Sequence, residues 1–325
     1  MDICLTFDYE LFFGTETGSV DKCLIEPTNE LLSLSSEHGI QMTFFVDVGY
    51  LIKLRENATE YVKLALDEQK VHEQLNRIKG QGHSLQLHVH PHWEKATFNG
   101  VKWEINPHKC YKLSDFNQQQ IKEILVKYKA FLEEITGEKV RIYRAGGWCI
   151  QPFQQVVNVF KELELSIDSS VMPGMRFTSE HYSFNFKDAP STCPYRFEND
   201  VCTQDSEGSF TEFPIATRRY SPYFFWRLYV LGRLFPSKHR MWGDGNFIVQ
   251  PGVKKKSLLK TIRHHVSTDG YFASVLDKAM KECQESSIEC MVTIGHPKSL
   301  TQFSLGKLRQ FIQRYGTKHR FISLK

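Results

Sequence analysis

Short apolar runs alternate with longer amphipathic segments along most of the chain. The apolar runs have the length and the β-branched or aromatic content that are typical of buried strands. They cover residues 3–7, 42–48, 84–87, 142–144, 166–169, 211–215 and 291–294. Strands that alternate with helices at this spacing predict a mostly parallel sheet with the helices outside it, either doubly wound or closed into a barrel.

Helical periodicity is clearest over residues 115–136, where an apolar stripe recurs every three to four positions. Ser114 can cap the start of this helix, and Gly137 follows its end. Further helices are expected at residues 26–38, 154–163, 258–265 and 272–286. They lie between the predicted strands, as the α/β pattern requires.

Two stretches depart from this alternation. Residues 94–112 are polar and aromatic, and residues 172–252 are longer, loop-rich and aromatic. No repeat, low-complexity tract or linker divides the chain. We therefore expect a single domain, residues 1–325, with insertions near 94–112 and 172–252.

Composition and charge exclude little. With 41% hydrophobic and 24% charged residues, the chain of 325 residues has the composition of a globular protein. The net charge of +4 neither demands nucleic acid, which we do not expect as a partner, nor excludes an anionic substrate. The eight cysteines form no CxxC pair, so we expect mostly reduced, buried thiols.

The first ten residues do not resemble a secretory signal. Such a signal needs a basic start followed by an apolar stretch of roughly 7–15 residues, whereas Asp2, Asp8 and Glu10 interrupt this one. We therefore expect a cytoplasmic protein.

Polar side chains gather at the ends of the predicted strands, and the carboxyl ends of parallel strands are where α/β proteins collect their chemistry. These residues are Asp8, Glu10, His88, His92, Arg144, Asp168 and His296. Carboxylates and imidazoles together suit a borderline divalent metal such as zinc, and three protein ligands leave a position open for water. The pattern predicts metal-assisted hydrolysis.

The residues alone leave the metal ligands open. Asp8 and Glu10 lie two positions apart, so both can point at one centre if the strand continues through Tyr9. His88, His90 and His92 would share a face of an unbroken strand, and a His-x-His pair is itself a metal signature. Pro91, however, breaks regular strand geometry.

The order of these motifs resembles the polysaccharide deacetylase family, the NodB-homology group of carbohydrate esterases. The first family motif is Thr-Phe-Asp-Asp; residues 6–8 match it, while Tyr9 replaces the second Asp and Glu10 follows one position later. This chain looks like a branch with an Asp-x-Glu form. Residues 42–46 resemble the next family strand. The second motif, a His-x-x-x-His pair after Gly-His, resembles residues 82–83 followed by His88 and His92.

The later motifs follow in the expected order. Residues 141–148 resemble the third motif, Arg-Pro-Pro-x-Gly, with Arg144 and Gly147 kept and both prolines absent. Residues 168–170 resemble the fourth motif, and residues 293–297 resemble the fifth, a strand that ends in a catalytic histidine. The resemblance covers the chain from residue 3 to about residue 300.

The resemblance implies a distorted (β/α) barrel with fewer than eight strands and the removal of an acetyl group from a sugar. It selects Glu10, His88 and His92 as ligands of a divalent metal, with zinc favoured over cobalt or nickel. Catalytic roles fall to Asp8 as base, His296 as acid, Asp168 as its orienting partner, and Arg144 in a bidentate pair with Asp8. For Arg144 a structural ion pair, and for Asp168 a turn cap, are equally good alternatives. Residues expected near the substrate are Tyr9, His90, Gly146, Gly147 and Trp148.

The leading hypothesis is a metal-dependent deacetylase acting on an N-acetylated sugar or saccharide precursor. One alternative uses the same groups on another non-peptide carbon–nitrogen bond. A second alternative is a carbohydrate-binding homologue that has lost catalysis, which the substitution at Tyr9 and the missing prolines would explain.

The aromatic segment 220–235 is not explained by the family motifs. Its apolar stretch, residues 223–235, is shorter than the ~20 residues that a membrane span requires. We expect a buried helix that covers one end of the barrel. The alternative is an interfacial helix that serves a lipid-linked sugar, so that peripheral membrane contact stays open.

Overall fold

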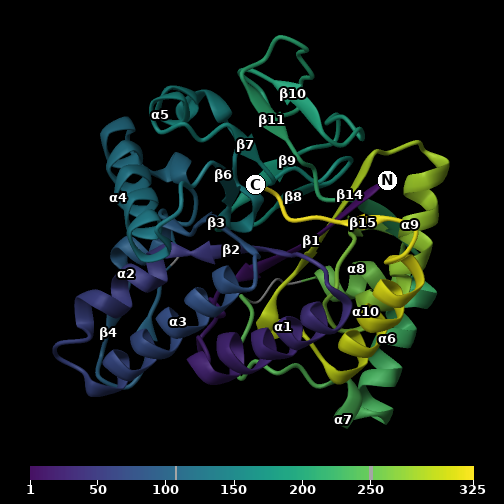
Figure 1. The fold of residues 1–325 in the computed structure, drawn as a ribbon, viewed down its shortest axis with the longest axis horizontal. Helices are drawn as coiled ribbons and strands as arrows, with labels where there is room; N and C mark the ends of the chain where they lie inside the picture. Colours follow the sequence, from purple (N-terminus) through teal and green to yellow (C-terminus); the bar gives the residue numbers. More distant parts are fainter. Residues whose placement is uncertain (107, 249–251) are drawn as a thin grey trace.

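A single curled sheet runs through the centre of the protein, and helices cover its outer side (Figure 1). The computed structural model describes residues 1–106, 108–248 and 252–325. The eight cysteines all lie in these ranges and are free thiols. Within the same ranges, no helix combines the length and the apolar character needed to cross a bilayer.

The sheet is almost entirely parallel, as the strand–helix alternation predicts. Its strands follow the order β10-β11-β7-β6-β3-β2-β1-β14, and β15 pairs with β1. Only β10 and β11 pair in antiparallel fashion. The strands are β1 (Asp2–Tyr9), β2 (Thr43–Asp47), β3 (Ser84–Val89), β6 (Ile142–Ala145), β7 (Ile167–Asp168), β10 (Tyr195–Phe197), β11 (Phe210–Glu212), β14 (Cys290–Gly295) and β15 (Arg320–Phe321).

The two ends of this sheet approach each other. Ile215, just after β11, forms a parallel bridge with Val292 of β14. The N–H of Ala216 donates to the carbonyl oxygen of Val292 at 2.9 Å. The parallel strands β14, β1, β2, β3, β6, β7 and β11 therefore surround one interior. This confirms the prediction of a distorted (β/α) barrel of the NodB type. Seven strands surround the interior, fewer than eight as expected, while β10 and β15 extend the whole sheet to nine strands.

Helices connect the strands and pack on the outside of the barrel. The α-helices are α1 (Glu26–His38), α2 (Val48–Asn57), α3 (Val62–Gly80), α4 (Gln118–Thr136), α5 (Val157–Glu162), α6 (Pro222–Leu234), α7 (Pro236–His239), α8 (Val253–Leu259), α9 (Leu276–Glu285) and α10 (Gln302–Tyr315). Single turns of other helix types are η1 (Asp21–Ile25), η2 (Pro91–Lys95), η3 (Leu113–Asp115), η4 (Gly146–Trp148), η5 (Phe153–Gln155), η6 (Gly270–Val275) and η7 (Pro297–Ser299).

Two expectations about helices need correction. Helix α4 is capped by Asn117, whose side chain accepts from the Gln120 N–H, and not by Ser114; Gly137, in the left-handed region at φ 64°, ends it as predicted. Residues 258–265 are not one helix, because α8 ends at Leu259 and β13 (Ile262–His265) pairs with β12 (Thr217–Tyr220). This short strand ends four residues before Asp269.

The two stretches expected as insertions contain small antiparallel sheets. Residues 94–112 hold the hairpin of β4 (Thr97–Phe98) and β5 (Trp103–Glu104). Residues 172–252 hold the hairpin of β8 (Arg176–Thr178) and β9 (Ser183–Asn185), but also β10 and the barrel strand β11. The second stretch therefore contributes to the barrel itself.

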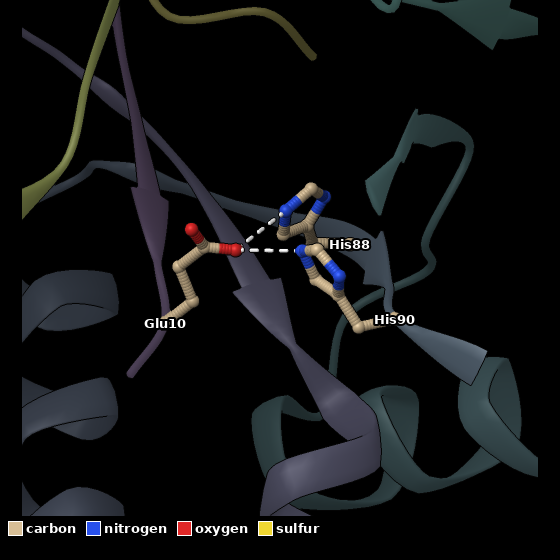
Figure 2. A group of neighbouring side chains, drawn as sticks. All are labelled: Glu10, His88 and His90. Atoms are coloured by element: carbon tan, nitrogen blue, oxygen red, sulfur yellow. Dashed lines mark hydrogen bonds and ion pairs between the residues drawn. The ribbon is translucent and has the colours of Figure 1, made fainter. Parts of the chain in front are cut away.

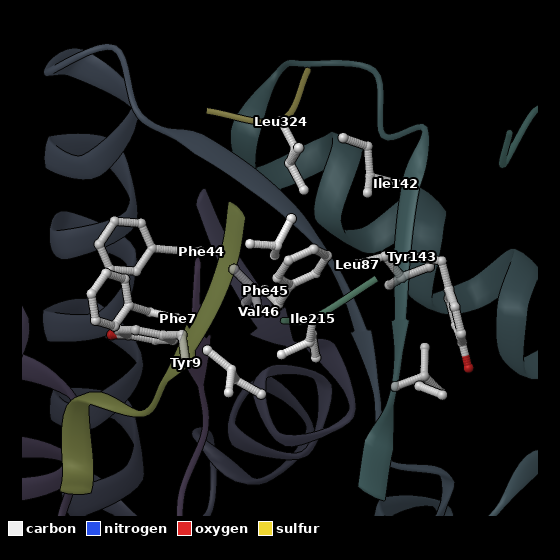
Figure 3. Packing of buried hydrophobic residues seen from close by; sticks show 14 of the residues in the cluster. Phe7, Tyr9, Phe44, Phe45, Val46, Leu87, Ile142, Tyr143, Ile215 and Leu324 are labelled. Carbon is white, nitrogen blue, oxygen red and sulfur yellow. The ribbon is translucent and has the colours of Figure 1, made fainter. Parts of the chain in front are cut away.

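The alternation of side chains along β1 decides what faces the barrel interior. Phe7 stacks on Phe44 of β2 with ring centroids 5.6 Å apart, and Tyr9 lies beside them on the face covered by helices (Figure 3). Asp8, between Phe7 and Tyr9, points to the opposite face, where Phe45 of β2 also lies. Burial of the aromatic layer thus fixes the direction of a candidate catalytic carboxylate.

Candidate metal and catalytic site

A carboxylate and two imidazoles converge where β1 and β3 end (Figure 2). Glu10 directly follows β1, His88 lies in β3, and His90 directly follows β3. Glu10 Oε2 is 3.0 Å from His88 Nε2 and 2.8 Å from His90 Nε2. One ligand atom from each of the three buried residues lies within 4.8 Å of the others. One ion placed among them can be reached by all three.

The partners of His88 fix the orientation of its ring. His88 Nδ1 lies 2.9 Å from the carbonyl oxygen of Arg144, which can only accept, so Nδ1–H donates and Nε2 faces Glu10. Burial lowers the pKa of His88, but Asp8 and Glu10 raise it to about 9. For His90 burial prevails and lowers the pKa to about 4. The surrounding carboxylates therefore favour positive charge at His88.

His92 lies outside this cluster. It belongs to the turn η2, which begins at Pro91, and its ring stacks on Tyr111 with centroids 5.6 Å apart. Neither ring nitrogen has a hydrogen-bond partner among the described residues, and burial lowers the pKa of His92 well below its usual value. The geometry thus brings His90 to Glu10 and His88, in place of the His92 that the family resemblance selected.

The Gly146-Gly147 turn was expected to lie near the substrate. In the structure, the absence of side chains at these glycines makes room for protein side chains. A Cβ on Gly146 would lie 2.6 Å from His90 Nδ1, so this glycine allows the imidazole to reach its position. Gly147 adopts φ 58°, and a Cβ there would lie 2.5 Å from the Tyr111 ring. Gly147 and Trp148 still line the cavity beside the site.

Asp8 and Arg144 form a buried ion pair with a single close contact. Arg144 Nη1 donates to Asp8 Oδ1 at 2.7 Å, while the other guanidinium nitrogens donate to the carbonyl oxygen and hydroxyl of Ser169. The predicted bidentate pair is therefore not present. Asp8 Oδ2 remains 3.7 Å from the Nε2 atoms of both His88 and His296. This oxygen is the one left free to accept a proton.

His296 follows β14 and is held by Asp269. His296 Nδ1 lies 2.8 Å from Asp269 Oδ2, and the His296 backbone N–H donates to Asp269 Oδ1 at 2.8 Å. Burial lowers the pKa of His296, but the carboxylates of Asp269, Asp8 and Glu10 raise it above its usual value. The imidazole can therefore hold a proton on Nε2, the atom that faces Asp8.

Asp269 takes the place that the sequence analysis gave to Asp168. Asp168 Oδ1 accepts the Ser170 hydroxyl at 2.7 Å, and the carboxyl lies beside Glu212 of the neighbouring strand. Burial raises the pKa of both carboxyl groups. Asp168 raises the pKa of Glu212 further, whereas the hydrogen bond with Glu212 lowers the pKa of Asp168. Ser170 in turn accepts the Ala145 N–H, so Asp168 supports the turn after β6. Within the described ranges, no hydrogen bond or ion pair joins Asp168 to His296.

Lys298 also belongs to the site, although no sequence pattern pointed to it. Its ammonium donates to Glu10 Oε1 at 2.8 Å and to the carbonyl oxygen of Leu11 at 2.5 Å, and it is buried. Burial would raise the pKa of Glu10, but Lys298, His90 and His88 lower it well below its usual value. Lys298 lies two positions after His296. Asp269 follows β13, which was expected to be part of a helix. Both residues therefore come after strands, as the predicted site residues do.

Tyr9 has no part in the cavity. Its hydroxyl donates to Gln74 of α3 at 2.8 Å, on the helix-covered face of the sheet. Burial raises the pKa of the Tyr9 hydroxyl far above its usual value. The prediction that Tyr9 contacts substrate therefore disagrees with its position, and the residue serves the packing of β1 against α3.

These groups open into one large cavity of about 990 Å³, close to the upper end of the range for small-molecule sites. Its polar end holds Asp8, Glu10, His88, His90, His296 and Lys298. From there it continues past aromatic side chains such as Trp148 and Phe184 to Leu228 and Tyr229 of α6. The cavity therefore joins a polar end at the strand ends to an apolar end at α6.

The profile of the polysaccharide deacetylase family matches residues 2–164. The chain belongs to the polysaccharide deacetylase family. Membership supports deacetylase activity and implies an acetylated saccharide as the substrate class. The matched span carries Asp8, Glu10, His88, His90 and Arg144, whereas Asp269, His296 and Lys298 lie beyond it.

Solved structures agree with the deacetylase fold. A protein from Mycobacterium smegmatis assigned as a polysaccharide deacetylase is 15% identical, with a TM-score of 0.51 over 99% of this chain and 86% of that one. PuuE allantoinase is 12% identical, with a TM-score of 0.52 over 99% of this chain and 87% of that one. At these identities the likeness shows the fold alone. No curated protein matches this deacetylase family member by sequence.

Proposed function

We propose that this protein removes the acetyl group from an N-acetylated sugar and that Glu10, His88 and His90 hold the divalent metal this requires. The observation that carries the proposal is the convergence of these three residues with Asp8 and His296 in one cavity. An amide hydrolase needs a base for water and an acid for the leaving amine. Both groups are present beside the ligand cluster.

The three residues fit a divalent metal. Two imidazole nitrogens and one carboxylate oxygen form a donor set that zinc, cobalt and nickel all accept. Lys298 contacts Glu10 Oε1, so Oε2, which faces both histidines, is the oxygen left for a metal. When bound, a divalent cation polarises a carbonyl group and makes a water molecule more acidic.

Asp8 is the proposed base. Its Oδ1 is occupied by Arg144, which fixes the carboxylate and leaves Oδ2 to accept a proton from the attacking water. Arg144 is fully buried and is itself held by Ser169 and by the ring of Phe45, 3.9 Å from the guanidinium carbon. The base is therefore held in one orientation before substrate arrives.

His296 is the proposed acid. Asp269 accepts from Nδ1–H, which leaves the second proton of the imidazolium on Nε2. Nε2 lies 3.7 Å from Asp8 Oδ2, so acid and base face the same small volume from the ends of the neighbouring strands β14 and β1. When the carbon–nitrogen bond breaks, Nε2–H can protonate the departing amine, and the sugar leaves with a neutral amino group.

The ligand set is tested by the metal content of two histidine variants. His90→Ala should lose the metal and the release of acetate from N-acetylated sugars. His92→Phe, which keeps an aromatic ring against Tyr111, should keep about one equivalent of metal and should keep its activity. Metal lost from His92→Phe and kept by His90→Ala would instead favour the His-x-x-x-His pair.

Substrate and metal-uptake assays on the wild-type protein separate the alternatives. Acetate release from sugars, with no turnover of simple cyclic amides, favours the sugar deacetylase over an enzyme for another carbon–nitrogen bond. Sugar binding by a wild-type protein that takes up no added zinc, cobalt or nickel would favour a binding protein without catalysis. The cytoplasmic location stays a prediction, and none of these outcomes depends on it.

A further inference from the structure

Exposed apolar side chains concentrate in one part of the described chain. Of the thirteen large hydrophobic residues that are exposed in the described ranges, nine lie between residues 223 and 259. The nine are Tyr223, Trp226, Val230, Leu234, Phe235, Met241, Phe247, Val253 and Leu259. Four of them lie in α6, two in α8, and the other three in the residues between these helices that lie outside α7. A concentration of apolar side chains of this kind on a solvent-exposed face marks an interaction surface.

Helix α6 has two distinct apolar faces. Phe224 and Phe225 are buried against Tyr220 and Tyr271, so part of the helix packs on the protein as the sequence predicts. On the other side a stripe recurs at helical spacing in solvent, with Tyr223 69%, Trp226 54% and Leu234 65% exposed. The expectation of a buried helix therefore holds for one face only.

Basic side chains surround this exposed stripe. Residues 213–268 contain eleven Lys and Arg residues and a single acidic residue, Asp244, whereas the rest of the chain has 30 basic and 36 acidic residues. On the helical wheel, Arg227 and Arg233 flank the stripe on its two sides. In the described ranges, no carboxylate pairs with the basic residues of α6, α7 or α8. The positive charge of these three helices is thus uncompensated, whereas Arg218, before them, pairs with Glu282.

The three helices form one continuous surface. Lys254 of α8 places its ammonium 4.6 Å from the centre of the Tyr229 ring in α6, and α7 follows α6 after a single residue (Figure 1). Together α6, α7 and α8 present aromatic and aliphatic side chains among lysines and arginines. Apolar and cationic groups in such a mixture favour the interface of an anionic lipid bilayer.

The catalytic cavity reaches the same helices. Its lining runs from Asp8 and His296 to Leu228, Arg233 and Lys254 on the inner side of α6 and α8. One helix thus presents its exposed stripe to solvent and its opposite edge to the cavity. A substrate whose lipid lies in a bilayer under the exposed stripe can extend its sugar into the cavity.

We propose that the surface formed by α6, α7 and α8 binds an anionic lipid bilayer, and that the acetylated saccharide is carried on a lipid in that bilayer. The second part rests on the proposed deacetylase function. The first does not, because the surface is argued from exposure and charge alone. Arg233 and Lys254, at the apolar end of the cavity, suit an anionic linkage between sugar and lipid.

Flotation of the full-length protein with vesicles tests the bilayer part. Vesicles of phosphatidylcholine with about one third phosphatidylglycerol should carry the protein at ~0.1 M salt and release most of it at ~0.5 M salt. Vesicles of phosphatidylcholine alone should carry much less. Absence of flotation, or equal flotation with both vesicles, would overturn the proposal.

Variants outside the cavity localise the binding. Arg227→Gln, Lys238→Gln and Lys255→Gln together should lower the partition coefficient on the order of a hundredfold, about fivefold for each charge. Trp226→Ser with Leu234→Ser should lower it at least roughly tenfold. The matched control is Val62→Ser with Leu66→Ser, two exposed apolar residues on α3, which should change nothing. A concentration-dependent dimer that Trp226→Ser disperses, with no vesicle binding, would assign the surface to a second copy of the chain.

Two substrates separate this inference from the proposed function. Acetate release from a soluble N-acetylated oligosaccharide reports deacetylation without a membrane, and the exposed-face variants should match the wild type. Release from an N-acetylated sugar joined through phosphate to an isoprenoid lipid in vesicles should fall with the partition coefficient. Vesicle binding without any acetate release would refute the deacetylase function but not the membrane-binding surface. Equal release from both substrates in all variants would refute the lipid-linked substrate.

Discussion

The catalytic end of the barrel and the surface of α6, α7 and α8 differ in how their residues are held. At the catalytic end, groups from β1, β3, β6 and β14 meet in buried, directed contacts such as Arg144 to Asp8 at 2.7 Å. On the helical surface, residues close in sequence expose apolar and basic side chains to solvent. A site built from directed contacts should lose its activity when a single group is replaced. Binding by the helical surface should weaken a little with each substitution, because each exposed side chain contributes separately.

The largest expected effect is at Asp8. In Asp8→Asn the side-chain oxygen can still accept from Arg144 Nη1, so the fold and the metal site should survive. An amide cannot take up the proton of the attacking water, so kcat/KM for acetate release should fall by about 10²–10⁴-fold. The control measurement is metal content, which should stay at the wild-type value, whereas Tm should fall because the buried Arg144 loses its counter-charge.

Activity within about tenfold of the wild type in Asp8→Asn would assign the base to another group. Loss of metal in this variant would instead place Asp8 among the ligands. Either result would weaken the picture of a site in which each buried oxygen has one task.

The next largest effect is expected at Lys298. Lys298→Met removes the ammonium from Glu10 and leaves a buried carboxylate with one partner fewer, which should cost about 3 kcal/mol of unfolding free energy in chelator. A divalent ion can supply the missing positive charge. Added zinc should therefore stabilise the variant more than the wild type, as measured by denaturant unfolding with and without zinc.

The same stabilisation by zinc in both proteins would show that Lys298 and the metal do not share Glu10. A variant that is as stable as the wild type in chelator would contradict the buried ion pair itself. The matched control is Lys102→Met, whose partner Glu16 is exposed, and whose loss should cost less than about 1 kcal/mol.

The sequence predicts most of the barrel, because burial of apolar strands determines it. It predicts only part of the site, because contacts between residues far apart in the chain determine the rest. Buried parallel strands have continuous apolar runs, so the seven strands expected from the sequence correspond to barrel strands. Asp8, Glu10, His88, Arg144 and His296 could be singled out because each follows or ends such a run. The choice between His90 and His92 depended on the turn at Pro91 and on the space beside Gly146, which no local pattern reveals.

Asp269 was missed for a related reason. The strand before it, β13, pairs with β12 across more than forty residues of sequence and has only four residues of its own. Its two histidines and its arginine give no strand-like alternation, so the segment was assigned to a helix. Asp168, by contrast, ends a barrel strand, but Glu212 and not His296 lies beside it.

A smaller effect, visible mainly in its pH dependence, is expected at Asp269. Its carboxylate raises the pKa of His296 and so keeps the imidazole protonated to higher pH. Asp269→Asn removes this charge, so the pKa should fall and the alkaline limb of the kcat profile should move to lower pH. At pH 8 the rate should drop about tenfold for each unit of that shift and should recover in part at acidic pH.

A profile that keeps its alkaline limb while the rate falls evenly would show that Asp269 only positions the ring. The matched control is Asp168→Asn, because Asp168 has no contact with His296. Asp168→Asn should leave the alkaline limb where it is, whatever it does to stability, and a shift there would contradict the assignment of Asp269.

The smallest effect on folding is expected on the exposed face of α6, where the two regions of the comparison lie on one helix. Trp226→Ser with Leu234→Ser should change the unfolding free energy by no more than about 0.5 kcal/mol for each residue, because both side chains are exposed. Phe224→Ser, on the buried face, should cost about 3 kcal/mol. If the exposed pair cost as much as Phe224, that face would be covered in the folded protein, and the bilayer would have no free surface to bind.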